Sequence, residues 1–198
     1  VASTKAAALK FLAEGCPKPD FTENFIGNVN MGEAEVTIAP CIKSDTLMGA
    51  LRNLFASIKP GDYFALDAFL PFDGEGRREA LEVIRHGVAD KLGVVSCLEI
   101  GPRYLHSTGQ LQKGGTNNGV FLMVSADELK DIPLRHVEPE SLGMLARTQA
   151  AADLSILIER GRRCMHLHLP DNSGVTIRAL GDAIMKVLDE IERERAAE

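Results

Sequence analysis

The pattern of apolar and polar positions predicts alternating strands and helices over most of the chain. Four runs rich in aromatic and aliphatic residues have strand character, namely DYFALDAFLP, VVSCLEIG, GVFLMVSA and RCMHLHLP. Apolar residues recur at helical spacing in GRREALEVIRHGVADKLG, SLGMLARTQAAADLSILIERG and VTIRALGDAIMKVLDEIERERAAE. From residue 59 onward the predicted order is therefore strand, helix, strand, strand, helix, strand and helix.

This order is the split βαβ pattern of a ferredoxin-like α+β sandwich. We expect an antiparallel sheet with its helices on one face, in which the two middle strands pair directly. The residues before this region predict a helix in VASTKAAALKFLAEG, a short strand in EVTIA and a helix in SDTLMGALRNLFASIKPGD, capped by Ser44 or Asp45. We therefore divide the chain into a helical and connecting segment, 1–58, and a ferredoxin-like domain, 59–198.

Composition and charge narrow the class of protein. Hydrophobic residues make up 45% of the 198 positions and charged residues 25%, which is ordinary for a folded soluble domain. The formal net charge of −6 argues against a nucleic-acid surface, which needs a basic face. No apolar run approaches the roughly 20 residues that span a bilayer, so we expect neither a membrane segment nor a membrane partner. The expected location is the cytoplasm.

The cysteines favour a reducing compartment. Cys16, Cys41, Cys97 and Cys164 are widely spaced and form no C-x-x-C pair. This spacing fits neither a disulfide framework nor a zinc site. We interpret Cys97 and Cys164 as core residues of strands, because neither stands at an evident helix N-terminus beside a cation that would activate a thiol.

One segment concentrates residues suited to binding an anion. GPRYLHSTGQLQKGG, from Gly101 to Gly115, is predicted to be a long loop between two strands, and long loops in compact domains are often functional. Glycine-rich backbone and cationic or hydroxyl side chains together can cradle a phosphate. The candidates for phosphate or substrate binding are Arg103, Ser107, Thr108, Gln110, Lys113, Gly114 and Gly115.

His106 is the candidate acid or base of this segment, because imidazole titrates near neutral pH. The alternative is a structured loop in which Ser107, Thr108, Gln110 and Asn117 satisfy their own backbone. The pattern is not a Walker loop, since Gly114 rather than Ser or Thr follows Lys113.

A second candidate site is one face of the predicted sheet. His166 and His168 are two residues apart on a strand and therefore point to the same side. The same alternation gives Asp67 a place on the first predicted strand and Glu99 one on the second. Asp67 is expected near the histidines, because the first and fourth strands of a ferredoxin-like sheet are neighbours. Two histidines without a clear third ligand are weak grounds for a metal site. We therefore expect no metal and no other cofactor, and interpret the face as a half-buried polar surface packed on another domain or chain.

Three stretches of the sequence carry a resemblance to a known family. KPGDYFALDAFLP, GPRYLHSTGQLQKGGTNNGVFLMVSAD and LARTQAAADLSILIERGRRCMHLHL resemble the C-terminal region of the bifunctional transaldolase/glucose-6-phosphate isomerase family, over roughly Lys59 to Leu169. The opening VASTKAAALKFL is similar to the segment that follows the lysine motif of the isomerase in that family. Val1 is not an initiator Met, which agrees with a domain cut from a longer polypeptide.

The resemblance implies a parent polypeptide that handles sugar phosphates. Its transaldolase part would form a lysine Schiff base, and its isomerase part would interconvert glucose 6-phosphate and fructose 6-phosphate by proton transfer without a metal. In that family the isomerase's phosphate loops, glutamate base and lysine motif belong to upstream domains and have no counterpart here. We therefore expect a C-terminal domain whose 101–119 loop contacts the phosphosugar or the neighbouring isomerase domains of the same polypeptide.

An alternative from a different class remains open. Small α+β sandwiches often bind ligands or form homo-oligomers through an open sheet face, so the chain could be a non-catalytic ligand-binding or oligomerisation module. The face with Asp67, Glu99, His166 and His168 would serve that purpose. A hydrolase is a weaker third interpretation, because the sequence shows no evident set of nucleophile, base and orienting residue.

Overall fold

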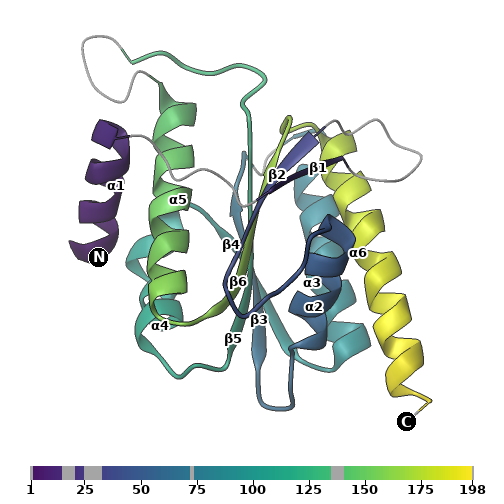
Figure 1. Ribbon diagram of the computed structural model, residues 1–198. Helices are drawn as coiled ribbons and strands as arrows, with labels where there is room; N and C mark the ends of the chain where they lie inside the picture. Colours follow the sequence, from purple (N-terminus) through teal and green to yellow (C-terminus); the bar gives the residue numbers. More distant parts are fainter. Residues whose placement is uncertain (1, 15–20, 25–32, 72–73, 135–140, 198) are drawn as a thin grey trace.

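The fold is a three-layer arrangement in which one sheet separates two layers of helices (Figure 1). The computed structural model describes residues 2–14, 21–24, 33–71, 74–134 and 141–197. Helices α1, α4 and α5 lie on one side of the sheet, and α2, α3 and α6 lie on the other. None of the helices in these residues is long and apolar enough to cross a membrane.

The sheet has six strands in the order β1-β2-β6-β5-β3-β4. Their bounds are Phe21–Asn24 for β1, Glu33–Ile38 for β2, Tyr63–Phe69 for β3, Val95–Ile100 for β4, Gly119–Ala126 for β5 and Arg163–Leu169 for β6. The β3 strand pairs parallel with both β4 and β5, and β5 pairs parallel with β6. The β1 strand runs antiparallel to β2, and β2 runs antiparallel to β6, so the centre of the sheet is parallel and one edge is antiparallel.

The helices connect these strands across both faces. Their bounds are Ala2–Glu14 for α1, Leu47–Ala56 for α2, Arg77–Leu92 for α3, Thr108–Gly114 for α4, Leu142–Glu159 for α5 and Gly174–Arg195 for α6, with a short 3₁₀ helix η1 at Arg103–His106. The predicted helices and strands from residue 63 onward are all confirmed in type. Ser141 caps α5 as predicted, accepting a hydrogen bond from Met144 N, whereas α2 is capped by Thr46 rather than Ser44 or Asp45.

Two-sided burial explains the apolar character of the central strands. In β5, Val120, Leu122 and Val124 belong to the core on the α3 and α6 side, while Phe121 and Met123 belong to the core on the α5 side. A strand covered on both faces needs apolar residues at successive positions, which is typical of parallel sheets.

The combination of helices and strands is confirmed, but the predicted antiparallel sheet is wrong. The two middle strands of the predicted order, β4 and β5, do not pair with each other, because β3 lies between them. The segment expected to be a loop between them contains η1 and α4, so it crosses over β3 as a helical connection. Helices consequently cover both faces of the sheet rather than one (Figure 1).

The predicted boundary at residues 58 and 59 does not mark the edge of the compact fold. The β2 strand, whose existence in EVTIA was predicted, pairs with β6 inside the same sheet. Helix α2 adds Leu51, Leu54 and Phe55 to the core shared with α3 and α6. At least the residues from 33 onward therefore fold together with the rest of the described chain.

The start of α6 packs tightly against the loop before α3. A Cβ atom at Gly174 would overlap the carbonyl oxygen of Glu75, whose backbone φ is 54°. The Arg178 side chain donates to the same carbonyl at 3.3 Å. These contacts hold together the loops that follow β3 and β6.

We expect Gly174→Ala to lower the free energy of unfolding by about 1–3 kcal/mol, because the added methyl forces backbone apart in a packed site. Urea unfolding followed by circular dichroism measures the change. The matched control is Gly181→Ala in the same helix, where the new Cβ would lie 3.6 Å from Ile84 Cγ1. That control should be neutral or stabilising by up to about 1 kcal/mol, since alanine favours helix. Equal effects of the two substitutions would contradict the proposed close packing.

Candidate functional site

A pocket lies outside the carboxyl ends of the parallel strands. Its walls come from the ends of β3 and β4 and from the segment between β5 and α5, with contributions from Phe69, Gly101 and Glu128. The chain leaves β3 through α3 on one face of the sheet and leaves β5 through α5 on the other. In open sheets with parallel strands, such a reversal between neighbouring strands creates a crevice where ligands commonly bind.

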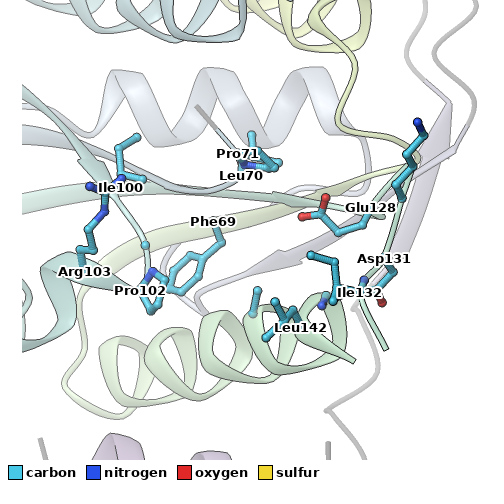
Figure 2. Close-up of a pocket in the computed structure, with 14 residues that line it drawn as sticks. Phe69, Leu70, Pro71, Ile100, Pro102, Arg103, Glu128, Asp131, Ile132 and Leu142 are labelled. Atoms are coloured by element: carbon cyan, nitrogen blue, oxygen red, sulfur yellow. Dashed lines mark hydrogen bonds between the residues drawn. The ribbon is translucent and has the colours of Figure 1, made fainter. Parts of the chain in front are cut away.

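The pocket has an apolar middle and charged ends (Figure 2). Its volume is about 460 Å³, which suits a small ligand. Arg103 lies at one end, Glu128 and Asp131 lie at the other, and Phe69 lies between them. The backbone at Gly101 lies close to the Phe69 ring, since a Cβ at Gly101 would lie 2.7 Å from Phe69 Cδ1. Glycine at position 101 thus allows the end of β4 to form the wall.

The N-terminus of α5 borders the pocket, but its amides already have partners. Asp131 Oδ1 accepts from Gly143 N and from Ile132 N, both at 2.8 Å. Ser141 Oγ accepts from Met144 N at 3.1 Å. The Ser141 and Gly143 hydrogen bonds lower the pKa of Asp131. Because a carboxylate of the chain occupies this helix end, an incoming anion has to be recognised by side chains elsewhere in the pocket.

Several polar side chains of the segment 101–115 point into the protein interior. Tyr104 Oη donates to Asp153 Oδ2 at 2.8 Å, and the ammonium of Lys113 donates to Asp153 Oδ1. Asp153 on α5 is fully buried, and Lys113 is only 7% exposed. This ion pair links α4 to α5. The predicted role of Lys113 in a surface phosphate site therefore does not fit its position.

Asp67 and Gln112 form a second buried pair beside this ion pair. Gln112 Nε2 donates to Asp67 Oδ1 at 2.9 Å, while Asp67 Oδ2 and Gln112 Oε1 have no other partner among the described residues. Complete burial, together with nearby Asp153, raises the pKa of Asp67 well above its ordinary value. A protonated Asp67 would satisfy both remaining atoms, because Oδ2–H can donate to Oε1. In that state the pair is a neutral acid hydrogen-bonded to a neutral amide.

The other predicted residues of this segment separate into distinct surroundings. Arg103 lines the carboxyl-end pocket, whereas His106 lines a different cavity of about 310 Å³ between α1 and α5. Ser107 and Thr108 are exposed, as is Gly114. The structure therefore does not gather the predicted phosphate ligands around His106.

Part of the segment satisfies its own backbone, as the alternative interpretation proposed. Ser107 Oγ donates to Tyr104 O at 3.3 Å, and Gln110 Nε2 donates to Leu105 O at 2.5 Å. The carbonyl of Gly115 accepts from buried Arg162 at 2.7 Å.

The polar sheet face predicted from strand alternation exists, but it is covered. Asp67, Glu99, His166 and His168 share the side of the sheet on which η1, α4 and α5 pack. Asp67 pairs with Glu99 across β3 and β4. It does not neighbour the histidines as expected, because β5 lies between β3 and β6. In the described part of the chain, helices therefore cover most of this face, and Glu99 on the edge strand β4 stays half-buried.

The two histidines belong to a chain of hydrogen bonds. His168 Nε2 lies 3.0 Å from Asp127 Oδ1, Ser125 Oγ lies 2.8 Å from His168 Nδ1, and His166 Nε2 lies 2.7 Å from the same Ser125 Oγ. Because the Asp127 carboxylate accepts, His168 carries its proton on Nε2 and accepts from Ser125 through Nδ1. Ser125 Oγ then accepts from His166 Nε2–H. This chain of contacts assigns one tautomer to each ring.

Burial keeps both rings neutral. Desolvation, with help from His168 and Arg147, lowers the pKa of His166 to about 3. Desolvation and Arg147 also lower the pKa of His168, although Asp127 opposes the shift. Arg147 on α5 pairs with Glu35 of β2 at 2.7 Å, so the same group of charges joins α5 to the antiparallel edge of the sheet.

Ser125, His168 and Asp127 are the residue types of a nucleophile, base and orienting acid, a set that the sequence did not reveal. Ser125 is only 2% exposed, and its hydroxyl both accepts from one ring and donates to the other. It therefore has no free direction from which to reach a substrate, and acyl transfer is not supported. Among the described residues, no three His, Cys, Asp or Glu side chains cluster so as to hold a metal ion.

The thiols of Cys97 and Cys164 are unsuited to nucleophilic chemistry. Cys164 is buried as predicted, and desolvation raises its pKa far above the ordinary value. Cys97 is half-buried against the α5-side core, and desolvation with nearby Glu99 raises its pKa to about 12. Both thiols are protonated at neutral pH, so neither is an activated nucleophile. Cys16 lies outside the described residues.

Several residues of these sites were not found from the sequence. Phe69 and Glu128 of the pocket lie at or just beyond the ends of β3 and β5, and recognising the sheet as parallel would have drawn attention to both positions. Tyr104, Gln112 and Asp153 of the interior cluster required the helical structure of residues 103–114 to be recognised.

We expect ionisation of Asp67 to make stability depend on pH. The folded chain holds this proton well above pH 3.8, the ordinary value at which the unfolded chain releases it, so the contribution of Asp67 to stability is present at low pH and is lost as pH rises towards its folded pKa. Asp67→Asn preserves an amide pair with Gln112 and should remove that part of the pH dependence. Urea unfolding between about pH 5 and 9 measures it, with Asp90→Asn on exposed α3 as control. An unchanged pH profile in Asp67→Asn would show that Asp67 is ionised in the folded chain.

We expect Ser125→Ala to destabilise the fold by about 1–3 kcal/mol, because a buried donor on His166 and a buried acceptor on His168 lose their partner. Ser155→Ala is the control, since Ser155 Oγ bonds only locally to Ala152 O at 2.9 Å. Urea unfolding gives the energies, and ¹⁵N shifts of the imidazoles report the tautomers. A cost no greater than that of the control, or Nδ1 protonation of His168 in the unsubstituted chain, would refute the assigned hydrogen bonds.

Comparisons with known proteins give the fold and little more. No protein-family model matches the chain, and no curated protein matches it. The chain is similar to the crystal structure of hypothetical protein TT0462 from Thermus thermophilus, with a TM-score of 0.58 and 18% identity. The match covers 74% of this chain and 38% of that one, so the chain spans well under half of the length of TT0462. At this identity the likeness establishes a shared fold only.

Proposed function

We propose that this chain is the C-terminal part of a sugar-phosphate enzyme of the transaldolase/glucose-6-phosphate isomerase type and contributes a phosphosugar-binding pocket. The observation that carries the proposal is the pocket of about 460 Å³ at the carboxyl ends of β3, β4 and β5. Its wall includes Arg103 from the segment GPRYLHSTGQLQKGG, which also carries the sequence resemblance. Such an enzyme would act in the cytoplasm and without a cofactor.

The geometry supports binding more directly than catalysis. Arg103 supplies a guanidinium, whose planar donors suit phosphate oxygens. Phe69 supplies an apolar surface for the carbon skeleton of a sugar, and Glu128 supplies a hydrogen-bond acceptor. The isomerase chemistry itself would reside in upstream domains of the same polypeptide.

A second candidate function is contact with one of those domains or with a second copy of the chain. Exposed apolar side chains favour it: Ile132 is 59% exposed and Leu142 is 44% exposed, and both line the pocket. Leu129 and Met144 nearby along the chain are also exposed. Sedimentation analysis over a range of concentrations tests self-association, and covering of the pocket by a partner would compete with ligand binding.

We expect glucose 6-phosphate and fructose 6-phosphate to shift the amide resonances of Gly101, Arg103 and Gly143 in an NMR titration. Arg103→Ala should weaken binding by about tenfold, the usual effect of losing a charged hydrogen bond. Arg160→Ala should leave affinity unchanged, because Arg160 lies at the far end of the 18-residue α5, about 21 Å along its axis from Ala146, the last residue of α5 that lines the pocket. The absence of any shift with either sugar phosphate would overturn the proposed function.

A further inference from the structure

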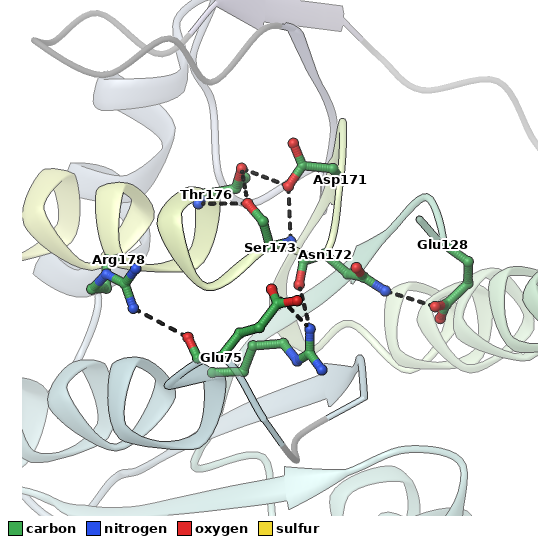
Figure 3. Close-up of polar contacts among 8 residues, drawn as sticks. Glu75, Glu128, Asp171, Asn172, Ser173, Thr176 and Arg178 are labelled. Atoms are coloured by element: carbon green, nitrogen blue, oxygen red, sulfur yellow. Dashed lines mark hydrogen bonds and ion pairs between the residues drawn. The ribbon is translucent and has the colours of Figure 1, made fainter. Parts of the chain in front are cut away.

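Glu128 is a pocket residue whose carboxylate is held by a neighbouring loop. It follows the end of β5 by two residues, and its carboxylate points into the pocket opposite Arg103 (Figure 2). Asn172 Nδ2 donates to Glu128 Oε2 at 2.6 Å (Figure 3). The structure records no donor to the other oxygen, Oε1, from the residues it describes. One oxygen is thus occupied by the protein, and one remains to accept from a ligand.

Asn172 is itself fixed by the loops around it. It is 4% exposed, and its carbonyl accepts from Arg77 Nη1 at 3.4 Å. Arg77 also pairs with Glu75 Oε2 at 3.3 Å. On the other side of Asn172, Asp171 Oδ1 accepts from Ser173 N and Thr176 Oγ1 at the start of α6. The orientation of Glu128 therefore depends on three loops that meet at the carboxyl edge of the sheet (Figure 3).

The surroundings of Glu128 make it a strong acceptor for hydroxyl groups. Desolvation, reinforced by Asp131, raises the pKa of Glu128, while Arg77 and the Asn172 hydrogen bond partly oppose the shift. Among the described residues, the charged groups around the pocket and the adjoining loops include Arg77, Glu75, Arg103, Lys130, Asp131 and Asp171. A partly desolvated carboxylate binds hydroxyl donors well and disfavours a second anion placed against it.

We propose that Glu128 and Arg103 orient the ligand, with its single phosphate at Arg103 and its hydroxyl-bearing end donating to Glu128. This inference rests on the proposed phosphosugar function and adds its specificity. The apolar stretch between the two ends, formed by Phe69, Pro102 and Ile132, holds the carbon skeleton. The pocket then selects monophosphorylated neutral sugars and rejects ligands whose opposite end carries a second negative charge.

Removing the charge of Glu128 should change the affinities for neutral and anionic sugar phosphates in opposite directions. Glu128→Gln removes the charge and keeps an acceptor for Asn172. If Glu128 receives sugar hydroxyls, this variant binds glucose 6-phosphate about five- to tenfold more weakly, because hydrogen bonds to a charged acceptor are stronger than those to a neutral one. The same variant binds 6-phosphogluconate more tightly than the unsubstituted chain does, because the carboxylate at the far end of that ligand is no longer repelled. Calorimetric titration of both ligands into the 198-residue chain measures the two affinities.

Asn172→Ala tests the positioning of Glu128 separately. It leaves the charge in place but frees the carboxylate, so glucose 6-phosphate should bind more weakly while the discrimination against 6-phosphogluconate persists. Thermal unfolding checks that each variant is folded, and inorganic phosphate serves as a probe of the Arg103 end, which Glu128→Gln should not weaken.

The outcomes separate this inference from the proposed function. If glucose 6-phosphate binds but Glu128→Gln tightens both ligands, or changes neither, Glu128 does not read hydroxyl groups and the orientation is wrong, although the pocket still binds phosphosugars. If neither glucose 6-phosphate nor 6-phosphogluconate binds the unsubstituted chain, the proposed function fails, and the orientation fails with it. Opposite changes in the two affinities support both.

Discussion

The parallel pairing of β3 with both of its neighbours is the constraint on which the rest of the structure depends. Parallel strands cannot be joined by tight hairpins, so each connection has to cross a face of the sheet. These crossings place helices on both faces, and the covered strands then require apolar residues at successive positions. The same geometry brings the carboxyl ends of β3, β4 and β5 to one edge, where the pocket forms.

The polar segment 101–115 packs against the sheet and supports that edge. Its inward side chains bind α5 through Asp153 and β3 through Asp67, and its first residues form the pocket wall beside Phe69. Burying so many polar groups costs free energy unless each has a hydrogen-bond partner. The choice of residues in this segment is therefore limited by its buried contacts as well as by any ligand. The polar residues Tyr104, Gln112 and Lys113, which suggested a binding loop, thus mainly link the helices to each other and to the sheet. The contribution of the segment to the surface is narrower and centres on Arg103.

Polar groups on the covered face of the sheet are arranged in two separate clusters. Asp67 and its partners lie under α4, whereas Ser125, His166 and His168 lie toward the β2 edge near Arg147. The described residues that line the carboxyl-end pocket include no member of either cluster. The pocket instead takes its polar groups from residues just beyond the strand ends, and the loops before α3 and α6 hold Glu128 in place through Asn172. Internal stability and ligand recognition therefore use different polar residues of the same sheet.

The sequence by itself determined the kind and order of most elements, because hydrophobic spacing and helix caps act locally. Ser141 begins α5 and Gly93 ends α3 in this way. The sequence also determined that His166 and His168 share one side of their strand, since alternation along a strand is a local property. That Asp67 and Glu99 lie on the same face of the sheet was decided by strand pairing and register. The sequence could not determine strand order, because four strands with this spacing can pair with antiparallel neighbours as well as with parallel ones. The short helix α4 was not recognised, because it carries polar residues that point inward instead of an apolar stripe. Only the tertiary structure decided that β3 lies between β4 and β5, because pairing joins residues far apart in the chain. Because β3 takes that place, the predicted phosphate loop is a helical connection that supports the sheet, and the candidate site lies at the strand ends. There Arg103 and Glu128 lie at opposite ends of the pocket, with Phe69 between them.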